Sequence, residues 1–295
     1  MRNNIIKNVI AISVLLFSVP AVFAQDNRHE VSLSVAGGLS TLSYDANIGE
    51  RKNGAGGNFG LGYTYFFIDN LGISSGVEFS LYKAEGKANK FNTVIHNLVD
   101  SSDGELYDHY SLFRAYKEKQ DVTYINVPLM LQYQLGEENK FYARAGVKLG
   151  IPVKGKYKSS ASEVVNKGFF HNTANWGETQ EFMGFGTVAN YSNDEDIDLN
   201  IACLLSAEAG MKWKLSDKMF LYTGAYIDYG VNDIVKGGHD RTFTRIEESP
   251  EALVVRNNSM LNSSIGYGSN TLTQQMTEKV RPISVGLTIR LSLPL

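Results

Sequence analysis

The residues best suited to ligand chemistry include a run of alternating aspartates. Asp194, Asp196 and Asp198 lie in the stretch NDEDID, which is similar to the start of a calcium-binding loop. An EF-hand loop that begins at Asp194 needs Gly at its sixth position and Glu at its twelfth. Those positions hold Leu199 and Leu205, so we expect an acidic, solvated loop end that binds no metal.

Histidines are a second group of residues that could take part in ligand binding or catalysis. Four histidines fall in long stretches without strand periodicity: His96, His109, His171 and His239. None has a metal-ligand spacing such as H-E-x-x-H. A hydrolase needs a nucleophile beside a His, and His109 lies near Ser111 while His239 precedes Asp240. Such neighbours arise by chance among dozens of polar residues, so we predict no enzymatic activity, no metal and no cofactor.

Charged side chains also occur inside strongly alternating stretches, and these carry more information. In FYARAGVKLGI, residues 141–151, Arg144 and Lys148 stand between apolar residues with a strict period of two. That period is typical of a β-strand with two unlike faces. In a soluble barrel the apolar face turns inward. In a membrane barrel it faces lipid, and Arg144 and Lys148 are enclosed.

The same alternation recurs along the chain. Eight segments show it: Val31–Leu39, Phe59–Phe67, Leu71–Leu81, Ile125–Leu135, Phe141–Ile151, Ile201–Trp213, Met219–Val231 and Ile283–Leu295. Each is roughly ten residues long, which matches a tilted membrane strand. In each segment, the alternate positions that hold apolar residues are called its apolar phase. The single cysteine, Cys203, lies at such a position and is interpreted as a small hydrophobic residue.

The connections alternate between short and long. Three are tight turns: 68–70, 136–140 and 216–218. Four are long: about 45–55, 85–120, 152–199 and 234–280. Short turns on one rim and long loops on the other are typical of outer-membrane barrels, and an even strand number places both ends on the short-turn, periplasmic rim.

Two of the long connections show helix-like signals. Within 105–118, Leu106, Tyr110 and Phe113 have the spacing of a short amphipathic helix, and Ser249-Pro250 within 246–255 is a helix-start signal. These loops could pack on themselves over the rim, or they could form a docking surface for a partner protein or a glycan.

Three observations indicate that the apolar residues of these segments face lipid and not the inside of a soluble barrel. The residues between them are small, for example Ser32, Ser34 and Gly76, whereas a water-facing sheet favours long polar side chains. The apolar phases carry almost no charge. Aromatic residues gather beside the short turns, as in an interfacial girdle: Tyr65, Phe67, Tyr133, Phe141 and Trp213. The alternative is a soluble, secreted, lipocalin-like binding barrel with the same alternation inverted.

The N-terminal segment and the amino-acid composition limit the classes of protein to which the chain can belong. Residues 1–24 combine a positive head with a short apolar stretch and small residues before Gln25, which predicts a secretory signal peptide. We therefore expect an outer-membrane β-barrel domain over 25–295. A net charge of −3 among 295 residues gives no basic footprint for nucleic acid. No internal apolar run approaches the length of a membrane helix.

The lumen is expected to hold a charge network. If the apolar phases face lipid, seven charged residues point inward: Glu78, Arg144, Lys148, Glu208, Lys212, Asp228 and Arg290. Ions removed from water must be paired, and an eight-stranded barrel has room for little beyond side chains. Five aromatic residues would help fill it: Tyr82, Tyr142, Phe220, Tyr222 and Tyr226. We expect a plugged lumen; a gated proton or small-ion path is the alternative.

A family resemblance follows from these features. The eight alternating segments, the stretch YINVPLMLQYQL (124–135) and the Gly-spaced strand after it resemble the PorT-like outer-membrane β-barrel proteins of Bacteroidetes. The resemblance implies a small outer-membrane barrel, and some members serve a protein-secretion machine. The chain departs from many such barrels in ending on Leu295 without a terminal aromatic residue.

Together these features predict an all-β, eight-stranded antiparallel transmembrane β-barrel with short periplasmic turns and long extracellular loops, located in the bacterial outer membrane. We expect a structural or interaction role through the extracellular loops, or an accessory role in protein secretion. The expected partners are outer-membrane lipid and lipopolysaccharide, together with envelope or secretion-machine proteins. A lipid-modifying outer-membrane enzyme is the alternative.

Overall fold

The computed structural model describes residues 28–100, 104–137, 139–248, 253–267 and 272–295. In these residues the chain is built almost entirely of β-strands, with one short 3₁₀ turn, η2 (Glu181–Met183). No helix of this part of the chain is long and apolar enough to cross a membrane. The expected signal peptide, residues 1–24, lies outside the described residues.

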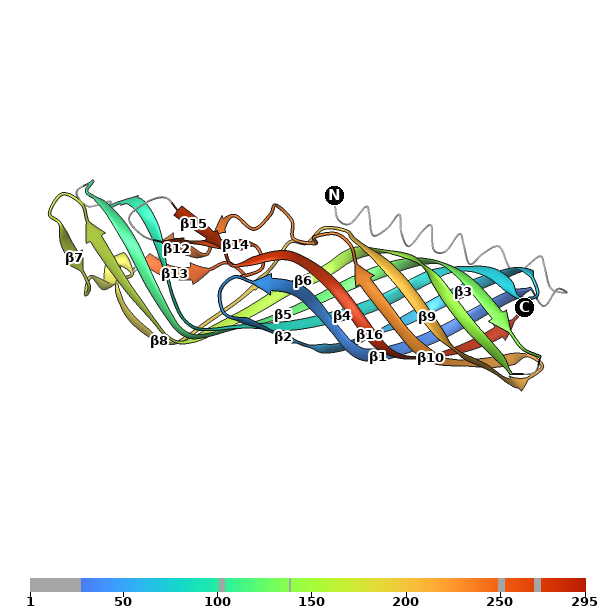
Figure 1. Cartoon of the computed structure of the whole chain (residues 1–295). Coiled ribbons are helices and arrows are strands. Elements are labelled where there is room, and N and C mark those ends of the chain that lie inside the picture. The colour runs from blue at the N-terminus through green and yellow to red at the C-terminus, as the bar shows by residue number, and fades with distance from the viewer. Residues whose placement is uncertain (1–27, 101–103, 138, 249–252, 268–271) are drawn as a thin grey trace.

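Eight of the described strands form a closed antiparallel ring. They are β1 (His29–Ala46), β3 (Ala55–Ile68), β4 (Leu71–Val99), β5 (Leu106–Leu135), β6 (Lys140–Phe170), β9 (Ala202–Ser216), β10 (Met219–Gly230) and β16 (Thr277–Pro294). The order around the ring is β4-β3-β1-β16-β10-β9-β6-β5, and pairing of β5 with β4 closes it. The ring is the barrel of Figure 1. Its first and last strands pair directly, from Glu30 opposite Pro294 to Ala46 opposite Thr277.

The apolar phases face outward on all eight strands. Exposed large apolar side chains include Val35 on β1, Leu131 on β5 and Leu287 on β16, which are 56%, 52% and 71% exposed. Lys148 and Arg290, in contrast, are buried inside the ring. This arrangement is the inverse of a soluble barrel, whose apolar residues face inward, and it forms a lipid-facing apolar band. The predicted transmembrane barrel is therefore confirmed, and the soluble lipocalin-like alternative is not.

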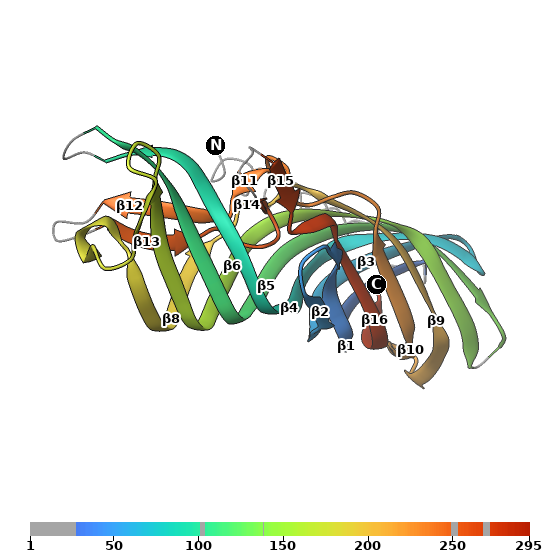
Figure 2. The ribbon, with the colours of Figure 1, turned by 60° about the vertical axis from the view of Figure 1, so that its left-hand side comes forward.

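Three of the barrel strands are far longer than a membrane requires. β4, β5 and β6 contain 29, 30 and 31 residues, whereas their neighbours β3 and β9 contain 14 and 15. At about 3.3 Å per residue, thirty residues span roughly 100 Å, against a hydrocarbon core of about 30 Å. These strands must therefore continue well outside the bilayer. Figure 2 shows them leaving the barrel as one curved sheet.

We name this sheet the extracellular extension: residues 83–99, 106–121 and 154–170 of the three long strands, together with β8 (Gly186–Asp196). β6 pairs with β9 as far as Gly150 and then with β8, from Lys156 opposite Asp196 to Asn166 opposite Gly186. Short strands complete the edges: β2 (Glu50–Asn53) pairs with β4, and β7 (Asn175–Gly177) pairs with the far end of β6.

The extension corrects two expectations about the long connections. The connections are long, but 85–99, 106–120 and much of 152–199 lie in strands and not in irregular loops. The expected amphipathic helix over 105–118 is wrong, because these residues belong to β5. In 246–255, the described residues 246–248 and 253–255 lie in strands, and the proposed helix start at Ser249-Pro250 lies outside the described residues.

The last long connection folds over the concave face of the extension. We call its described part, residues 234–248 and 253–267, the roof. It contains β11 (Arg241–Thr242), β12 (Thr244–Glu248), β13 (Leu253–Asn257) and β14 (Ser263–Tyr267), and β15 (Leu272–Gln275) pairs with β14. Phe243 of the roof is fully buried, with ring centroids 5.3 Å from both Phe91 and Phe113 of the extension. The roof therefore packs on itself and on the sheet of the extension.

Candidate functional site

The lumen of the barrel holds charged side chains in three tiers. The tier nearest the short turns is centred on Lys212 of β9. Its Nζ lies 2.5 Å from Glu30 Oε1 on β1 and 4.1 Å from the centroid of the Phe220 ring. The other oxygen of Glu30 accepts hydrogen bonds from the hydroxyls of Tyr222 (2.7 Å) and Ser292 (2.8 Å). Both charges are buried, and this tier closes the periplasmic end of the lumen.

The middle tier places one carboxylate between two guanidinium groups. Glu208 Oε2 lies 3.4 Å from Arg144 Nη1, and Glu208 Oε1 lies 3.9 Å from Arg290 Nη2. The Tyr142 hydroxyl donates to the same carboxylate at 2.8 Å. Arg290 also lies over the Tyr222 ring, 4.0 Å from its centroid, a favourable place for a cation.

In the third tier the charges are reversed, with one cation between two carboxylates. Lys148 Nζ lies 2.7 Å from Glu78 Oε2 and 3.1 Å from Asp228 Oδ2. These three residues come from β6, β4 and β10, so the tier ties together strands from opposite sides of the ring. Because a buried charge without a partner is costly, each tier favours the closed arrangement of strands.

The structure thus brings all seven expected lumen residues together, and it adds Glu30. With Glu30 the cluster contains four carboxylates and four cationic side chains. Sequence reasoning missed Glu30 because it precedes the first apolar residue of its strand. The alternation of the strand could have identified it, since Glu30, Ser32 and Ser34 are alternate residues and therefore point to the same face.

Side chains fill the space around these charges. Tyr82, Tyr142 and Tyr222 are at most 1% exposed and occupy the interior. A cavity lined by Ser34, Glu78, Arg144 and Arg290, among others, has a volume of about 20 Å³. That is room for about one water molecule, not for a continuous channel.

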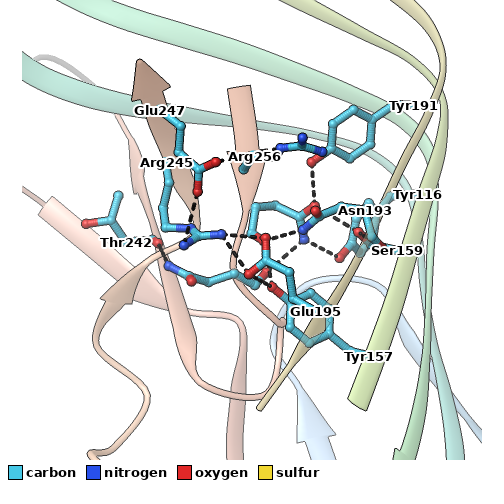
Figure 3. A network of polar contacts seen from close by, with 12 residues as sticks. Tyr116, Tyr157, Ser159, Tyr191, Asn193, Glu195, Thr242, Arg245, Glu247 and Arg256 are labelled. Atoms are coloured by element: carbon cyan, nitrogen blue, oxygen red, sulfur yellow. Dashed lines mark hydrogen bonds and ion pairs between the residues drawn. The ribbon is translucent and has the colours of Figure 1, made fainter. Parts of the chain in front are cut away.

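Outside the membrane, a second polar cluster joins the roof to the extension (Figure 3). Asn257 of β13 is fully buried, and its side-chain oxygen accepts hydrogen bonds from Ser159 (2.8 Å) and Tyr191 (2.7 Å). Its backbone oxygen accepts from the Tyr157 hydroxyl at 2.8 Å and from Asn193 at 2.9 Å. Every polar atom of the side chain is satisfied, so one residue fixes the roof to β6 and β8.

A buried carboxylate anchors the next part of the roof. Glu118 of β5 is fully buried and accepts hydrogen bonds from the Ser259 hydroxyl (2.6 Å) and the Met260 backbone N–H (2.9 Å). Tyr116 and Gln120 donate to the same carboxylate, and no described cation pairs with it. Burial raises the pKa of Glu118, although its hydrogen bonds act in the opposite direction.

His109 and His239 have no hydrogen bond to a serine hydroxyl among the described residues. Ser111 donates to Asn166 at 2.7 Å, and neither ring nitrogen of the buried His109 has a hydrogen-bond partner among the described residues. His239 Nε2 bonds to Asp233 at 2.7 Å. Ser111 and His109, the neighbours considered for the alternative hydrolase, are therefore not hydrogen-bonded to each other in the described chain. Burial lowers the pKa of His109 to about 4.

The other two histidines meet at the far end of the extension. His96 Nδ1 lies 2.8 Å from Asp108 Oδ2, and His171 Nε2 lies 3.0 Å from Asp108 Oδ1. Burial raises the pKa of Asp108, but hydrogen bonds from the Asn97 N–H and the two histidines lower it overall. Among the described residues, no group of three His, Cys, Asp or Glu side chains is placed so that it could hold a metal ion, and this holds for Asp194, Asp196 and Asp198 too.

The outer face of this far end carries an aromatic cluster. The ring of Trp176 lies 5.2 Å from those of both Tyr110 and Phe169, and Trp176 is 53% exposed. We call these three residues the distal aromatic patch. At the opposite end of the molecule, the periplasmic mouth forms a depression of about 660 Å³ lined by Glu30, Lys212 and Phe220, among others.

A closed ring of antiparallel strands with an apolar outer band and a sealed, charge-paired lumen defines a small outer-membrane β-barrel protein. Residues 23–234 match the model of the outer membrane protein beta-barrel domain family, and the chain belongs to this family. The protein is located in the bacterial outer membrane.

Comparison with solved structures gives outer-membrane barrels at low sequence identity. Neisserial surface protein A shares 11% identity, covering 90% of this chain and 97% of that one, with a TM-score of 0.33. The attachment invasion locus protein Ail of Yersinia pestis shares 12%, covering 90% and 99%, with a TM-score of 0.34. OprG of Pseudomonas aeruginosa shares 11%, covering 90% and 94%, with a TM-score of 0.32. No curated protein matches the sequence.

Proposed function

We propose that this protein is a sealed membrane anchor that presents a rigid extracellular β-sheet for interactions, and that it is not an enzyme. One observation carries the proposal. Strands β4, β5 and β6 run without interruption from the lipid-facing band into the extension, where an apolar core and the roof hold them. A plain membrane barrel requires no such structure.

The distal aromatic patch is the part of the extension best suited to contact a partner. Exposed Trp and Tyr side chains give large contact areas at little entropic cost, and such residues are enriched at interfaces. Strand β7, which contains Trp176, also stands at the end of the sheet farthest from the membrane, where a large partner meets least hindrance (Figure 1).

The partner class we propose is a protein of the cell envelope. The resemblance of residues 124–135 to PorT-like barrels of Bacteroidetes supports an accessory role in protein secretion. Such a role needs an anchor, a surface and no open pore, which agrees with the filled lumen. The periplasmic mouth offers a second, polar surface to envelope proteins on the other side of the membrane.

Site-specific crosslinking on intact cells tests the proposal. A photo-crosslinking amino acid at position 176 should give a discrete protein adduct, and the same amino acid at position 287, in the lipid-facing band, should not. Combining the probe with Tyr110→Ser and Phe169→Ser should reduce the adduct at least severalfold. Equal labelling from both positions, or no adduct at position 176, would contradict an interaction role for the distal aromatic patch.

Electrical recording separates this role from that of a pore. The purified barrel should show no stable conductance steps in planar bilayers, because the three tiers fill the lumen. Persistent conductance that Lys148→Ala or Glu208→Ala alters would instead favour an ion path through the charges.

A further inference from the structure

A basic patch lies on the outer face of the extension, just above the lipid-facing band. We define it as four exposed lysines: Lys117 and Lys119 of β5, and Lys154 and Lys158 of β6. Lys154 is opposite Thr123, two residues beyond the outward-facing Ile125. At about 3.3 Å per residue, the patch covers roughly 7 to 25 Å of strand above the apolar band.

A local irregularity of β6 points these lysines outward. Outward residues of β6 are odd-numbered within the membrane, as in Val147 and Leu149, but the register shifts between Thr123 and Tyr124 of the partner strand. After the shift Lys154, Lys156 and Lys158 are exposed, while Tyr157 is buried. β-Bulges often redirect side chains in this way.

Two cross-strand pairs of the patch join like charges. Lys119 stands directly opposite Lys158 across the β5–β6 pair, and Lys117 stands directly opposite Lys87 across β4–β5. Like charges in directly opposed positions destabilise a sheet. An anion placed between them would remove this repulsion.

The carboxylates of this region do not neutralise the patch. Glu85 bonds to Lys87 at 2.8 Å, Asp121 pairs with Lys83 and Asp196 pairs with Lys156, both at 3.8 Å. None of the four patch lysines forms an ion pair within 4 Å of a described acidic group, although Asp194 stands opposite Lys158 and Glu85 stands opposite Lys119. Counted together, seven lysines face four carboxylates here: Lys83, Lys87, Lys117, Lys119, Lys154, Lys156 and Lys158 against Glu85, Asp121, Asp194 and Asp196.

The opposite wall of the barrel has no such excess. At the same level on β1 and β16, Asp45 stands opposite Glu278, and Arg281 bonds to the Tyr229 hydroxyl. Positive charge above the apolar band is therefore concentrated on the β5–β6 side.

We propose that this patch binds the phosphate groups of lipopolysaccharide in the outer leaflet. Acyl chains of the glycolipid would lie along the apolar band formed by Leu129, Leu131 and Val147, and its phosphates would reach the lysines above. Continuity with the apolar band favours a lipid-anchored anion over a soluble one. Lysine is a common phosphate ligand, and basic clusters next to a membrane surface bind anionic lipid head groups.

Titration of the folded full chain in detergent with purified lipopolysaccharide tests the proposal. The triple variant Lys119→Ser, Lys154→Ser, Lys158→Ser should bind roughly a hundredfold more weakly, since each lysine near an anionic surface contributes about a fivefold factor. A control triple variant with the same charge change, Lys90→Ser, Lys218→Ser, Lys236→Ser, alters exposed lysines elsewhere and should bind within about twofold of the wild type.

Two further arms identify the group that is recognised. Dephosphorylated lipopolysaccharide should bind the wild type as weakly as intact lipopolysaccharide binds the patch variant, and added salt should weaken only the intact pair. Equal affinity of the patch and control variants would overturn the proposal, as would unchanged affinity for the dephosphorylated glycolipid. The crosslinking at position 176 is independent of this result, so the two proposals can fail separately.

Discussion

Glu30 and Lys212 are 182 residues apart in sequence, yet their charged groups meet at 2.5 Å inside the barrel. Glu30 lies at the start of β1 and Lys212 near the end of β9, on strands that do not pair with each other. Because both side chains are buried, neither charge can exist there without the other. The pair therefore works as a crosslink between two sides of the ring.

Replacing Glu30 with Gln should destabilise the folded barrel by about 3–5 kcal/mol, because Lys212 keeps a buried charge without a partner. The double variant Glu30→Gln, Lys212→Met should recover most of that loss. Unfolding by denaturant in lipid vesicles measures both. As a control, Asp121→Asn removes the exposed pair with Lys83 and should change stability by less than about 1 kcal/mol. A single variant as stable as this control would argue against the crosslink.

Replacing Glu208 with Ala should lower the unfolding temperature in detergent more than any other single carboxylate replacement in the lumen. Glu208 is the one carboxylate placed between Arg144 and Arg290 in the described lumen, so its loss leaves two buried guanidinium groups facing each other. Asp228→Ala is the matched comparison, since Lys148 retains Glu78 in that variant. An unchanged melting temperature for both replacements would show that the charges are not stabilised by pairing.

Replacing Glu118 with Ala should loosen the roof without opening the barrel. The change removes the acceptor for the Ser259 hydroxyl and the Met260 N–H, which leaves buried donors unsatisfied at a cost of about 2–4 kcal/mol. Added protease should then cut the roof faster, while the membrane part stays resistant. Glu163→Ala, which breaks an exposed pair with Arg114, is the control. Identical cleavage rates in the two variants would contradict an anchoring role.

The far end of the extension should lose stability at acidic pH. The pKa of His109 falls from about 6.5 to about 4 on folding, because the neutral ring is buried. The folded form binds fewer protons than the unfolded form, so stability is complete above pH 6.5 and is lost as the pH falls towards 4. The loss reaches about 3 kcal/mol. The stabilised carboxylate of Asp108 adds nothing in this window, since its pKa lies below 3.8.

Trp176 reports on this transition, because its ring packs on Tyr110 next to His109. With Trp213 replaced by Phe, Trp176 is the remaining tryptophan, and its fluorescence follows urea unfolding at each pH. When the pH is lowered from 7 to 5, the urea concentration at the unfolding midpoint should decrease in the Trp213→Phe protein. It should decrease much less when His109→Leu is added. The same pH dependence in both proteins would exclude His109 as its cause.

The membrane part of the fold could be predicted from the sequence because lipid imposes a strict pattern there. Outward positions there must tolerate acyl chains, so the period of two is uninterrupted between Ile125 and Leu135 and is broken only by Ser75 between Leu71 and Leu81. The short turns at 68–70 and 216–218 follow directly from where that pattern stops. Because alternate residues of a strand point to opposite faces, the residues between the outward apolar ones, including Glu30, can be predicted to face the lumen.

The extension could not be predicted in the same way. Its outer face contacts water, so the residues there need not be apolar, and its inner face contains both polar and apolar residues. Along β5, Tyr116, Glu118 and Gln120 all point inward, so no apolar period marks the strand. The helical spacing of Leu106, Tyr110 and Phe113 was a coincidence, since Phe113 is buried in the sheet while Leu106 is exposed. On β5, Tyr116 bonds to Asn257 of the roof, and Glu118 bonds to Ser259 and Met260. These partners lie more than 100 residues away in the sequence, and no local signal shows such contacts.

The central claim is that the apolar face of each barrel strand contacts lipid, and spin-label accessibility tests it most directly. With Cys203 replaced by Ser, single nitroxide labels would be placed by Val35→Cys, Leu131→Cys or Leu287→Cys, on three strands around the ring, and by Lys119→Cys above the apolar band. In bilayers, the first three labels should collide mainly with dissolved oxygen, and the label at position 119 mainly with a water-soluble nickel complex. If the labels at 35, 131 and 287 meet the nickel complex as readily as the label at 119, the apolar face does not contact lipid.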